Sequence, residues 1–459
     1  MDSFIQTYLA DHFDFHLKAR SGSLLDKIKR NVSKNHIYII LDDDPTGTQT
    51  VHDIDVYTSW DNETLTSLFN SGEQIAFILT NSRALTEPKA VYIAREIGRK
   101  IKRIAAKTGK SFTIVSRGDS TLRGHFPAEV DCLLEELGQP EAIKMIVPAF
   151  FPGGRYTFND IHYVKEGETL IPVAETPFAK DKSFGFSSSN LRNWVIEKYK
   201  GQIEESQVHS ISLEQIRTLT LKELSFHINK LPNGSSCIVN ATEQTDLEQF
   251  VKATQFVSRQ VFFRTAASLV PILIGQKQSD LLKKKDFQSS ETNGSLIVVG
   301  SYVPKTTSQL RYLMKKSDIE TLEIDVNQLF GRNTKVYLDA KINYCSTLIE
   351  KGRDVVIFTS RDLKFGGNQK RNLKIGKTIS TALVSIVSGL QVKPKTIIAK
   401  GGITSSDIAT KALKIKKARV LGQILPGVPV LQFGENQKYI VFPGNVGDDT
   451  ALYLAYKKI

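Results

Sequence analysis

The feature that most constrains this chain is an apolar, strand-like run, residues 37–41, that ends in three consecutive aspartates, Asp42, Asp43 and Asp44. Pro45 and Gly47 then force a turn. Adjacent carboxylates repel one another and lose solvation when packed, so a folded protein usually has a use for them. Ligands of open α/β sheets bind just beyond the carboxyl ends of strands. The run therefore predicts a site at a strand end, although a solvated acidic turn would also fit the same residues.

Strand-like runs alternate with amphipathic helical patterns along the whole chain. The first such strands are expected at 37–41, 75–79, 112–115 and 145–147, with helices at 88–107 and 127–137 between them. This alternation predicts an α/β fold with mainly parallel sheets flanked by helices. Residues 151–189, rich in Gly, Pro, Ser and aromatic residues, are expected to form a long irregular excursion.

The chain has 459 residues, which is too long for one ordinary core. A polar stretch, 276–294, precedes a second α/β pattern with strands expected at 296–299, 355–358, 396–399 and 439–442. We therefore expect a helical leader (1–35), a first domain (36–280), a linker (281–294) and a second domain (295–459), with the active site in the cleft between the domains.

Composition excludes several classes of partner. The net charge of +13 is spread along the chain and accompanies no zinc-finger or RNA-binding pattern, so no nucleic-acid partner is expected. Cys132, Cys237 and Cys345 lie far apart, which fits a reducing compartment without structural disulfides. The N-terminus carries no secretion signal and no membrane span, so a cytoplasmic protein is expected. Whether it forms a homo-oligomer is left open.

Polar residues follow two further strands of the first domain. Asn81-Ser82-Arg83 follows the run at 75–79, and residues 117–124 (Arg-Gly-Asp-Ser-Thr-Leu-Arg-Gly) follow the run at 112–115. In a parallel sheet these strand ends share one edge with the acidic turn. Carboxylates can bind or deprotonate hydroxyls, and Arg83 and Arg123 can hold a carboxylate, a set that suits a small polyhydroxy acid. Alternatively, Arg123 pairs with Asp119 as a scaffold salt bridge.

The second domain has three glycine turns that each lead toward a helix: Gly300-Ser301, residues 400–407 (Lys-Gly-Gly-Ile-Thr-Ser-Ser-Asp) and residues 442–449. Glycine lets backbone approach a phosphate, and a helix N-terminus offers free N–H groups. Three such turns favour nucleotide binding over ordinary strand-to-helix connections. Gly376-Lys377-Thr378 is not a P-loop, because Arg371 stands where that motif needs its first glycine.

Taken in order, these motifs resemble the four-carbon acid sugar kinase family from about Tyr38 to the C-terminus. The resemblance implies ATP-dependent phosphorylation of a terminal hydroxyl of a four-carbon sugar acid of the 3-oxo-tetronate, threonate or erythronate type. It places substrate contacts on Asp43, Asp44, Thr46, Arg83, Asp119, Ser120, Thr121 and Arg123. It places ATP contacts on Ser301, Gly401, Gly402, Ile403, Thr404, Gly444 and Asn445. Asp42 stands where the family more often has a small residue, which leaves the particular acid open.

The expected mechanism is in-line transfer from Mg-ATP. Asp44 or Asp43 would orient and deprotonate the attacking hydroxyl, or one of them would help to hold Mg²⁺, while Arg83 and Arg123 clamp the substrate carboxylate. One alternative is a haloacid-dehalogenase-type phosphatase with Asp42 as nucleophile, Asp44 as acid/base and Asp448-Asp449 as a late acidic pair. Another is a protein that binds these ligands without catalysis.

Overall fold

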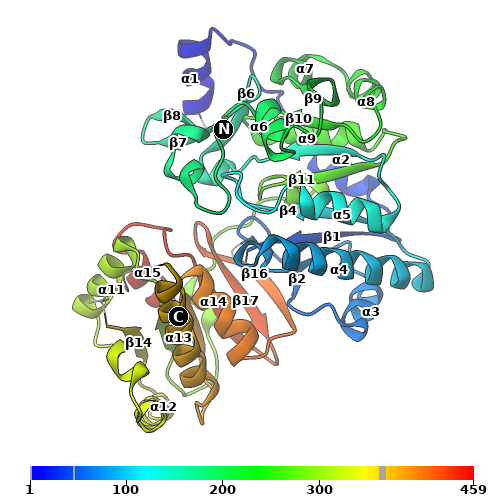
Figure 1. Cartoon of the computed structure of the whole chain (residues 1–459). Coiled ribbons are helices and arrows are strands. Elements are labelled where there is room, and N and C mark those ends of the chain that lie inside the picture. Colours follow the sequence, from blue (N-terminus) through cyan, green and yellow to red (C-terminus); the bar gives the residue numbers. More distant parts are fainter. Residues whose placement is uncertain (1–2, 45–46, 361–368) are drawn as a thin grey trace. The chain divides into compact units, whose positions relative to one another are not determined.

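The computed structural model describes residues 3–44, 47–360 and 369–459, with only the backbone described for 369–374. The chain forms two compact units (Figure 1): Met1–Val51 with Ser59–Gln278, and His52–Thr58 with Ser279–Ile459. Residues 52–58 were expected in the first domain but belong to the second unit. The reason is strand pairing, since β2 (Ile54–Tyr57) pairs antiparallel with β16 (Lys417–Leu425).

The first unit is built on parallel strands in the order β3-β1-β4-β11-β5-β10-β9. Their bounds are β1 (His36–Asp42), β3 (Ile75–Leu79), β4 (Ser111–Arg117), β5 (Ile143–Val147), β9 (Val208–Ile211), β10 (Ser236–Val239) and β11 (Val261–Thr265). The strands are short and almost wholly buried, as expected when helices cover both faces of a parallel sheet.

Helices connect and cover these strands (Figure 1). They are α3 (Asn62–Asn70), α4 (Glu87–Thr108), α5 (Ala128–Leu137), α6 (Leu191–Lys198), α7 (Leu213–Thr218), α8 (Leu221–Asn229), α9 (Gln244–Thr254) and α10 (Leu269–Leu273). The α4 crossover from β3 to β4 and the α9 crossover from β10 to β11 run in opposite directions along the sheet. Because such crossovers are right-handed, α4 and α9 cover opposite faces.

The N-terminal leader packs on the first unit. It contains α1 (Ser3–Phe13) and α2 (Leu25–Asn31). Ile5 and Leu9 of α1 are fully buried in an aromatic cluster that includes Tyr156 and Phe158. The backbone N–H of Leu24, just before α2, donates to a carboxylate oxygen of Glu248 at 2.6 Å.

The excursion at 151–189 is more regular than expected. It contains a small antiparallel sheet of β6 (Arg155–Phe158), β7 (Ile161–Glu166) and β8 (Thr169–Pro172). The prediction of an irregular loop is wrong here. The strands are only four to six residues long and alternate too briefly to give a clear sequence signal.

The second unit combines parallel and antiparallel strands in the order β13-β14-β12-β15-β18-β17-β16-β2. The remaining strand bounds are β12 (Leu296–Val299), β13 (Glu320–Ile324), β14 (Val355–Thr359), β15 (Thr396–Lys400), β17 (Val428–Phe433) and β18 (Gln437–Phe442). Neighbouring strands pair in parallel along β13-β14-β12-β15-β18. They pair antiparallel along β18-β17-β16-β2. The α/β class with mainly parallel sheets flanked by helices is therefore confirmed, and the antiparallel part was not predicted.

The helices of the second unit are α11 (Pro304–Lys316), α12 (Thr334–Glu350), α13 (Gln369–Ser388), α14 (Gly402–Asp407) and α15 (Ala451–Tyr456). A π-helical turn (Ile408–Ala412) continues α14, and a 3₁₀ helix, η7 (Val326–Phe330), precedes α12. Residues of β12, β14, β15 and β18 form the core with α11 and α15. In the part of the chain that is described, no helix has the length and apolarity needed to cross a membrane.

Candidate functional site

The ends of β1, β3 and β4 meet because these strands pair in parallel and in register. Asp42 lies opposite both Leu79 and Arg117. Just beyond, the Asp43 N–H donates to the Arg117 carbonyl at 3.3 Å, and the Arg83 N–H donates to the Asp43 carbonyl at 3.3 Å. Backbone pairing thus gathers the polar residues of three distant segments at one edge of the sheet. Together with Arg264 of β11 they form what we call the aspartate–arginine cluster: Asp42, Asp43, Asp44, Arg83, Arg117, Asp119, Arg123 and Arg264.

Asp42 is the most deeply buried carboxyl of the cluster, at 1% exposed. Its Oδ1 accepts a hydrogen bond from Arg117 Nη1 at 3.1 Å. Burial raises the pKa of Asp42 to about 7, against the opposing effect of Arg117. A Cβ on Gly47 would lie 1.7 Å from the Asp42 carboxylate, so only glycine lets the turn close over it.

Asp43 is buried, and neither of its carboxylate oxygens accepts a hydrogen bond in the described structure. Burial raises its pKa, while Arg83, Arg264 and Arg117 oppose that shift. A buried acceptor without a donor is costly, so such a group is a good candidate to meet a ligand.

Asp44, Arg83, Asp119 and Arg123 form a continuous chain of ion pairs. Arg83 pairs with Asp44 through Nη2 and with Asp119 through Nη1, the latter at 3.2 Å. Arg123 Nε donates to the other Asp119 oxygen at 2.7 Å. Burial alone would raise the pKa of Asp119, but Arg83 and Arg123 hold it well below its usual range. Asp44 is the most exposed of the three consecutive aspartates, with 19% of its side chain accessible.

The Asp119–Arg123 salt bridge left open by the sequence is therefore formed. Pairing with Asp119 does not use all the donors of Arg83 or Arg123, because each guanidinium has five N–H groups. Arg123 also stacks its guanidinium over the Phe178 ring, 5.1 Å from the centroid, and lies 3.9 Å from Asp181.

Two arginines of the cluster were given no role from the sequence: Arg117 was named only as the first residue of the 117–124 segment, and Arg264 was not singled out. Both are buried; Arg117 is the last residue of β4 and Arg264 the next-to-last residue of β11. Arg264 crosses beneath Gly118, where a Cβ would lie 1.8 Å from Nη1. The available signal was a charged residue at the end of each apolar strand, next to glycine in the case of Arg117.

Ser120 and Thr121 serve different partners. Thr121 Oγ1 donates to Asp119, and the Ser120 carbonyl accepts from His162 Nε2 at 2.8 Å. Burial lowers the pKa of His162 to about 4, so this histidine is neutral near pH 7. Thr46, also predicted to contact substrate, lies outside the described residues.

A cavity of about 730 Å³ borders the cluster within the first unit. Arg83 and Gly124 form part of its wall, together with Phe184, Lys198 and Tyr199. Gly124 has φ +126°, and a Cβ there would lie 3.1 Å from Asp43 Oδ2 and 3.2 Å from Arg264 Nη2. The absence of a side chain at Gly124 thus lets the buried carboxylate approach the cavity wall.

The predicted nucleotide contacts of the second unit also converge, at the ends of β12, β15 and β18. A Cβ on Gly401 (φ +116°) would lie 2.9 Å from Ser301 Cβ, and one on Gly300 would lie 2.3 Å from Thr404 Oγ1. A Cβ on Gly444 would lie 3.2 Å from Ser301 Oγ. Close backbone approach brings the three turns together, and we call them the glycine turns: Gly300-Ser301, Gly401-Gly402 and Gly444-Asn445.

Side chains of α11 hold the last of these turns in place. Thr306 Oγ1 donates to the Gly444 carbonyl at 3.0 Å. Gln309 Nε2 donates to the Val446 and Asp448 carbonyls at 3.0 and 2.7 Å. Thr306 and Gln309 are buried polar residues that the sequence did not single out.

Lys400, directly before Gly401, is fully buried and was not assigned a role from the sequence. Its Nζ donates to the Pro443 carbonyl at 2.7 Å and lies 3.9 Å from the centroid of the Phe442 ring. Burial lowers the pKa of Lys400 to about 7. This lysine links the second glycine turn to the third.

The remaining predicted nucleotide contacts differ in exposure. Ile403 is 71% exposed and Asn445 is exposed, whereas Thr404 is buried. A Cβ on Gly402 would meet no heavy atom within 4 Å, so open space lies in front of that residue. A ligand approaching the glycine turns could therefore reach the backbone at Gly402.

Two family models match this chain and agree with the two-unit architecture. Residues 38–273 match a sugar-binding N-terminal domain, and residues 296–452 match a nucleotide-binding C-terminal domain. The fold and matches define a protein with one sugar-binding and one nucleotide-binding domain. The chain belongs to the four-carbon acid sugar kinase family.

Individual relatives are distant. The chain is 29% identical over 256 residues to a D-erythronate kinase of Heliobacterium modesticaldum, an alignment that covers 55% of this chain and 53% of the relative. The aligned part thus spans about half the length of that curated relative. A Haemophilus influenzae protein has a similar fold, with TM-score 0.67, 18% identity, and coverage of 91% of this chain and 99% of its own. A Salmonella typhimurium LT2 protein described as a tRNA synthase gives TM-score 0.69 and 15% identity, with coverage of 93% and 100%.

Proposed function

We propose that this protein is an ATP-dependent kinase that phosphorylates the terminal hydroxyl of a four-carbon sugar acid of the 3-oxo-tetronate, threonate or erythronate type. The observation that carries the proposal is the aspartate–arginine cluster, in which Arg83 lines a cavity and pairs with the partly exposed Asp44. It lies in the region that matches a sugar-binding domain. The glycine turns lie in the region that matches a nucleotide-binding domain.

In this proposal Asp44 accepts the proton of the attacking hydroxyl. It is the most exposed of the three consecutive aspartates, and Arg83 holds its carboxylate in place. Arg83 and Arg123 keep donors free to bind the carboxylate of the acid, with Asp119 fixing both guanidiniums. Phosphoryl transfer asks a protein chiefly for such positioning and charge neutralisation.

The described residues contain no group of three or more metal ligands, so Asp43 would be one carboxylate that helps to hold a magnesium ion arriving with the nucleotide. Asp43 offers two carboxylate oxygens that accept no hydrogen bond within the described structure, and oxygen is the ligand that Mg²⁺ prefers. Mg²⁺ typically takes one or two protein carboxylates and completes its shell with phosphate and water. It would supply neutralisation of the phosphate charge, and Asp43 would hold it or a substrate hydroxyl.

The glycine turns would bind the nucleotide phosphates through backbone N–H groups. Ser301, Gly401 and Thr404 pack closely against one another, and open space lies in front of the neighbouring Gly402. Lys400 supports the Gly444 turn from beneath.

The phosphatase alternative is disfavoured by the position of Asp42. A nucleophile must reach the phosphorus atom, yet Asp42 is almost completely buried and bonded to Arg117. Asp448, offered as a late acidic residue of that mechanism, accepts from the Thr450 N–H and hydroxyl in the turn just before α15.

The proposal is tested by measuring ADP release from Mg-ATP with threonate, erythronate and 3-oxo-tetronates. We expect ADP formation that depends on one of these acids. Phosphate release from phosphorylated sugar acids without ATP would favour the phosphatase. ADP binding without turnover for any acid would favour a non-catalytic protein.

A further inference from the structure

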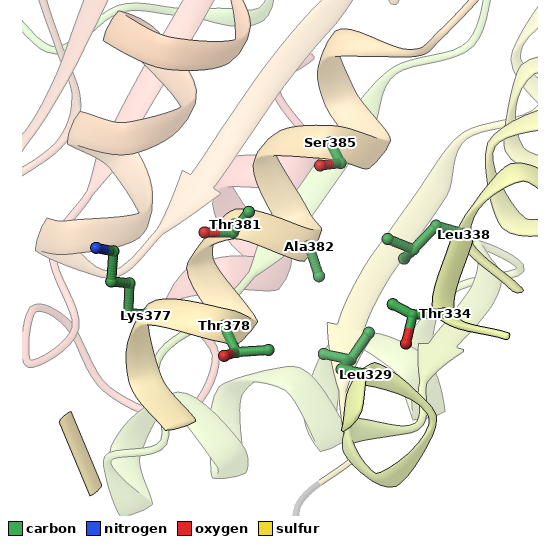
Figure 2. Close-up of a pocket in the computed structure, with 8 residues that line it drawn as sticks. All are labelled: Leu329, Thr334, Leu338, Lys377, Thr378, Thr381, Ala382 and Ser385. Atoms are coloured by element: carbon green, nitrogen blue, oxygen red, sulfur yellow. The ribbon is translucent and has the colours of Figure 1, made fainter. Parts of the chain in front are cut away.

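A second cavity, of about 410 Å³, lies within the second unit between α13 and the segment formed by η7 and α12. Figure 2 shows Thr378 and Ala382 of α13 pointing toward Leu329, Thr334 and Leu338 across the cavity. The Lys377 side chain extends from a different side of α13. The volume falls within the range of roughly 300–1,000 Å³ typical of small-molecule pockets.

The cavity wall combines aliphatic side chains with hydroxyl groups. Leu329, Leu338 and Ala382 supply the apolar surface, and Thr334, Thr378, Thr381 and Ser385 supply hydroxyls. The only charged lining residue among those described is Lys377, and no carboxylate lines the cavity. Such a wall suits a flat, mostly apolar heterocycle, since hydroxyls can both donate to and accept from ring nitrogens.

The helix that lines this cavity also contacts the glycine turns. Leu383, next to Ala382, places its Cδ1 2.9 Å from the position of a Cβ on Gly300. Ser380 donates to Asp407 of α14, the helix that starts at Gly402. Over residues 378–385, one face of α13 thus lines the cavity, and a neighbouring face of the same helix contacts the glycine turns.

Topology supports the same link. The connection leaving β12 enters α11, whereas those leaving β14 and β15 enter α13 and α14. The crossovers from β12 to β13 and from β14 to β15 run in opposite directions along the sheet, so α11 and α13 cover opposite faces. Ligands of open α/β sheets bind where connections leave neighbouring strands in opposite directions, which here is between β12 and β15, at the glycine turns beside α13.

We propose that this cavity binds the purine ring of the nucleotide whose phosphates meet the glycine turns. The inference rests on nucleotide use by the second unit, as stated under the proposed function. It adds the location of the base and predicts that base and phosphates are held by separable parts of the protein.

The experiment compares ADP with inorganic tripolyphosphate, a ligand that has phosphates but no base. Binding of each is measured by calorimetry for the full chain and for Ala382→Leu and Thr378→Leu, which fill the cavity. We expect the Kd of ADP to rise at least about tenfold in both variants, because the base loses its contacts, while the Kd of tripolyphosphate stays within about twofold. Ala340→Leu, an exposed position on α12, is the matched control and should leave both constants unchanged.

Ala382 is nearly buried, so Ala382→Leu could disturb packing, and the more exposed Thr378→Leu then carries the test. Unchanged ADP binding in a folded variant would overturn the inference, as would an equal loss for ADP and tripolyphosphate. Absence of ADP binding by the wild-type protein would overturn the proposed nucleotide use and this inference with it. ADP binding with the expected variant pattern but no acid-dependent turnover would contradict only the proposed kinase reaction.

Discussion

The aspartate–arginine cluster of the first unit and the glycine turns of the second are built from different material. In the cluster, charged side chains at and just beyond the ends of β1, β3 and β4 neutralise one another in a largely buried network. In the glycine turns, the absence of side chains at Gly300, Gly401 and Gly444 lets backbone segments approach one another. Arginine and carboxylate geometry can distinguish one small acid from another, whereas backbone N–H groups bind any phosphate at the right distance.

The two regions also differ in how they tolerate change. Loss of one charge in the cluster leaves a buried partner uncompensated, which is costly. Replacing a glycine with alanine adds a methyl group, and its effect on stability depends on how much open space lies at that position. The following predictions test this difference, from the largest expected effect to the smallest.

The largest effect is expected for Asp44→Asn. The amide cannot accept the hydroxyl proton, so kcat for the sugar acid should fall by about 10²–10⁴-fold. ADP affinity should stay within about twofold, because the glycine turns do not contain this residue. Steady-state kinetics and ADP calorimetry measure the two quantities, with Asp11→Asn on the exposed side of α1 as the control. Full activity of Asp44→Asn would remove Asp44 from the mechanism.

Gly402→Ala separates ligand contact from folding. The added methyl meets no protein atom within 4 Å, so the melting temperature should not fall. If phosphates approach this backbone, the Kd of ADP should rise by about tenfold. Gly376→Ala, where a Cβ also meets no heavy atom within 4 Å, should leave ADP affinity unchanged and should not lower the melting temperature, because alanine favours the helix interior more than glycine does. Equal ADP affinity in both variants would place the phosphates away from Gly402.

Lys400 should make ADP binding depend on pH. Its buried ammonium loses its proton near pH 7, so the charge that favours a polyanion is present below that pH and lost above it. We expect ADP affinity to fall severalfold from pH 6 to pH 8.5. Lys400→Met should abolish that part of the dependence, leaving only the titration of ADP itself. Calorimetry across this range compares the two proteins, and identical slopes would contradict the prediction.

The smallest effect is expected for Asp42 and concerns stability. Burial raises its folded-state pKa from about 4 to about 7, so between these values the folded state keeps a proton that the unfolded state loses. Stability from this group is therefore greatest at the acid end of the window and falls as pH rises toward 7. Urea titrations at pH 5 and pH 8 give the free energy of unfolding of each protein. The difference between the two pH values should be smaller in Asp42→Asn than in the wild-type protein. An unaltered pH slope would show that Asp42 does not titrate there.

Much of the fold could be predicted from the sequence because its signals are local. Short apolar strands such as residues 37–41 and 75–79 alternate with long amphipathic helices, and α4 was predicted to within about one residue at each end. The sheet of β6–β8 and the antiparallel strands β16 and β17 were missed. Their strands are either very short or joined by tight turns, and neither case resembles the alternation of strands and helices.

The candidate site likewise contains some residues that the sequence identified and others that it did not. The acidic turn, Arg83 and the 117–124 segment were chosen from the sequence, because each follows a strand of a parallel sheet. Arg264 could not be chosen, because it lies about 140 residues beyond Asp119 and joins the cluster only through the pairing of β11 with β4. Similarly, Lys400 gave no sign of its contact with the Pro443 carbonyl, which exists because β15 pairs with β18.

By itself, the sequence determined which residue types stand at the strand ends and where glycine permits close approach, because both depend on neighbours along the chain. The tertiary structure decided which of those groups are buried, paired or left without a donor. Asp42, Asp43 and Asp44 are chemically identical, yet one bonds Arg117, one accepts no hydrogen bond within the described structure, and one is partly exposed and pairs with Arg83. Burial and partners across the sheet, which no local pattern encodes, distinguish their chemistry.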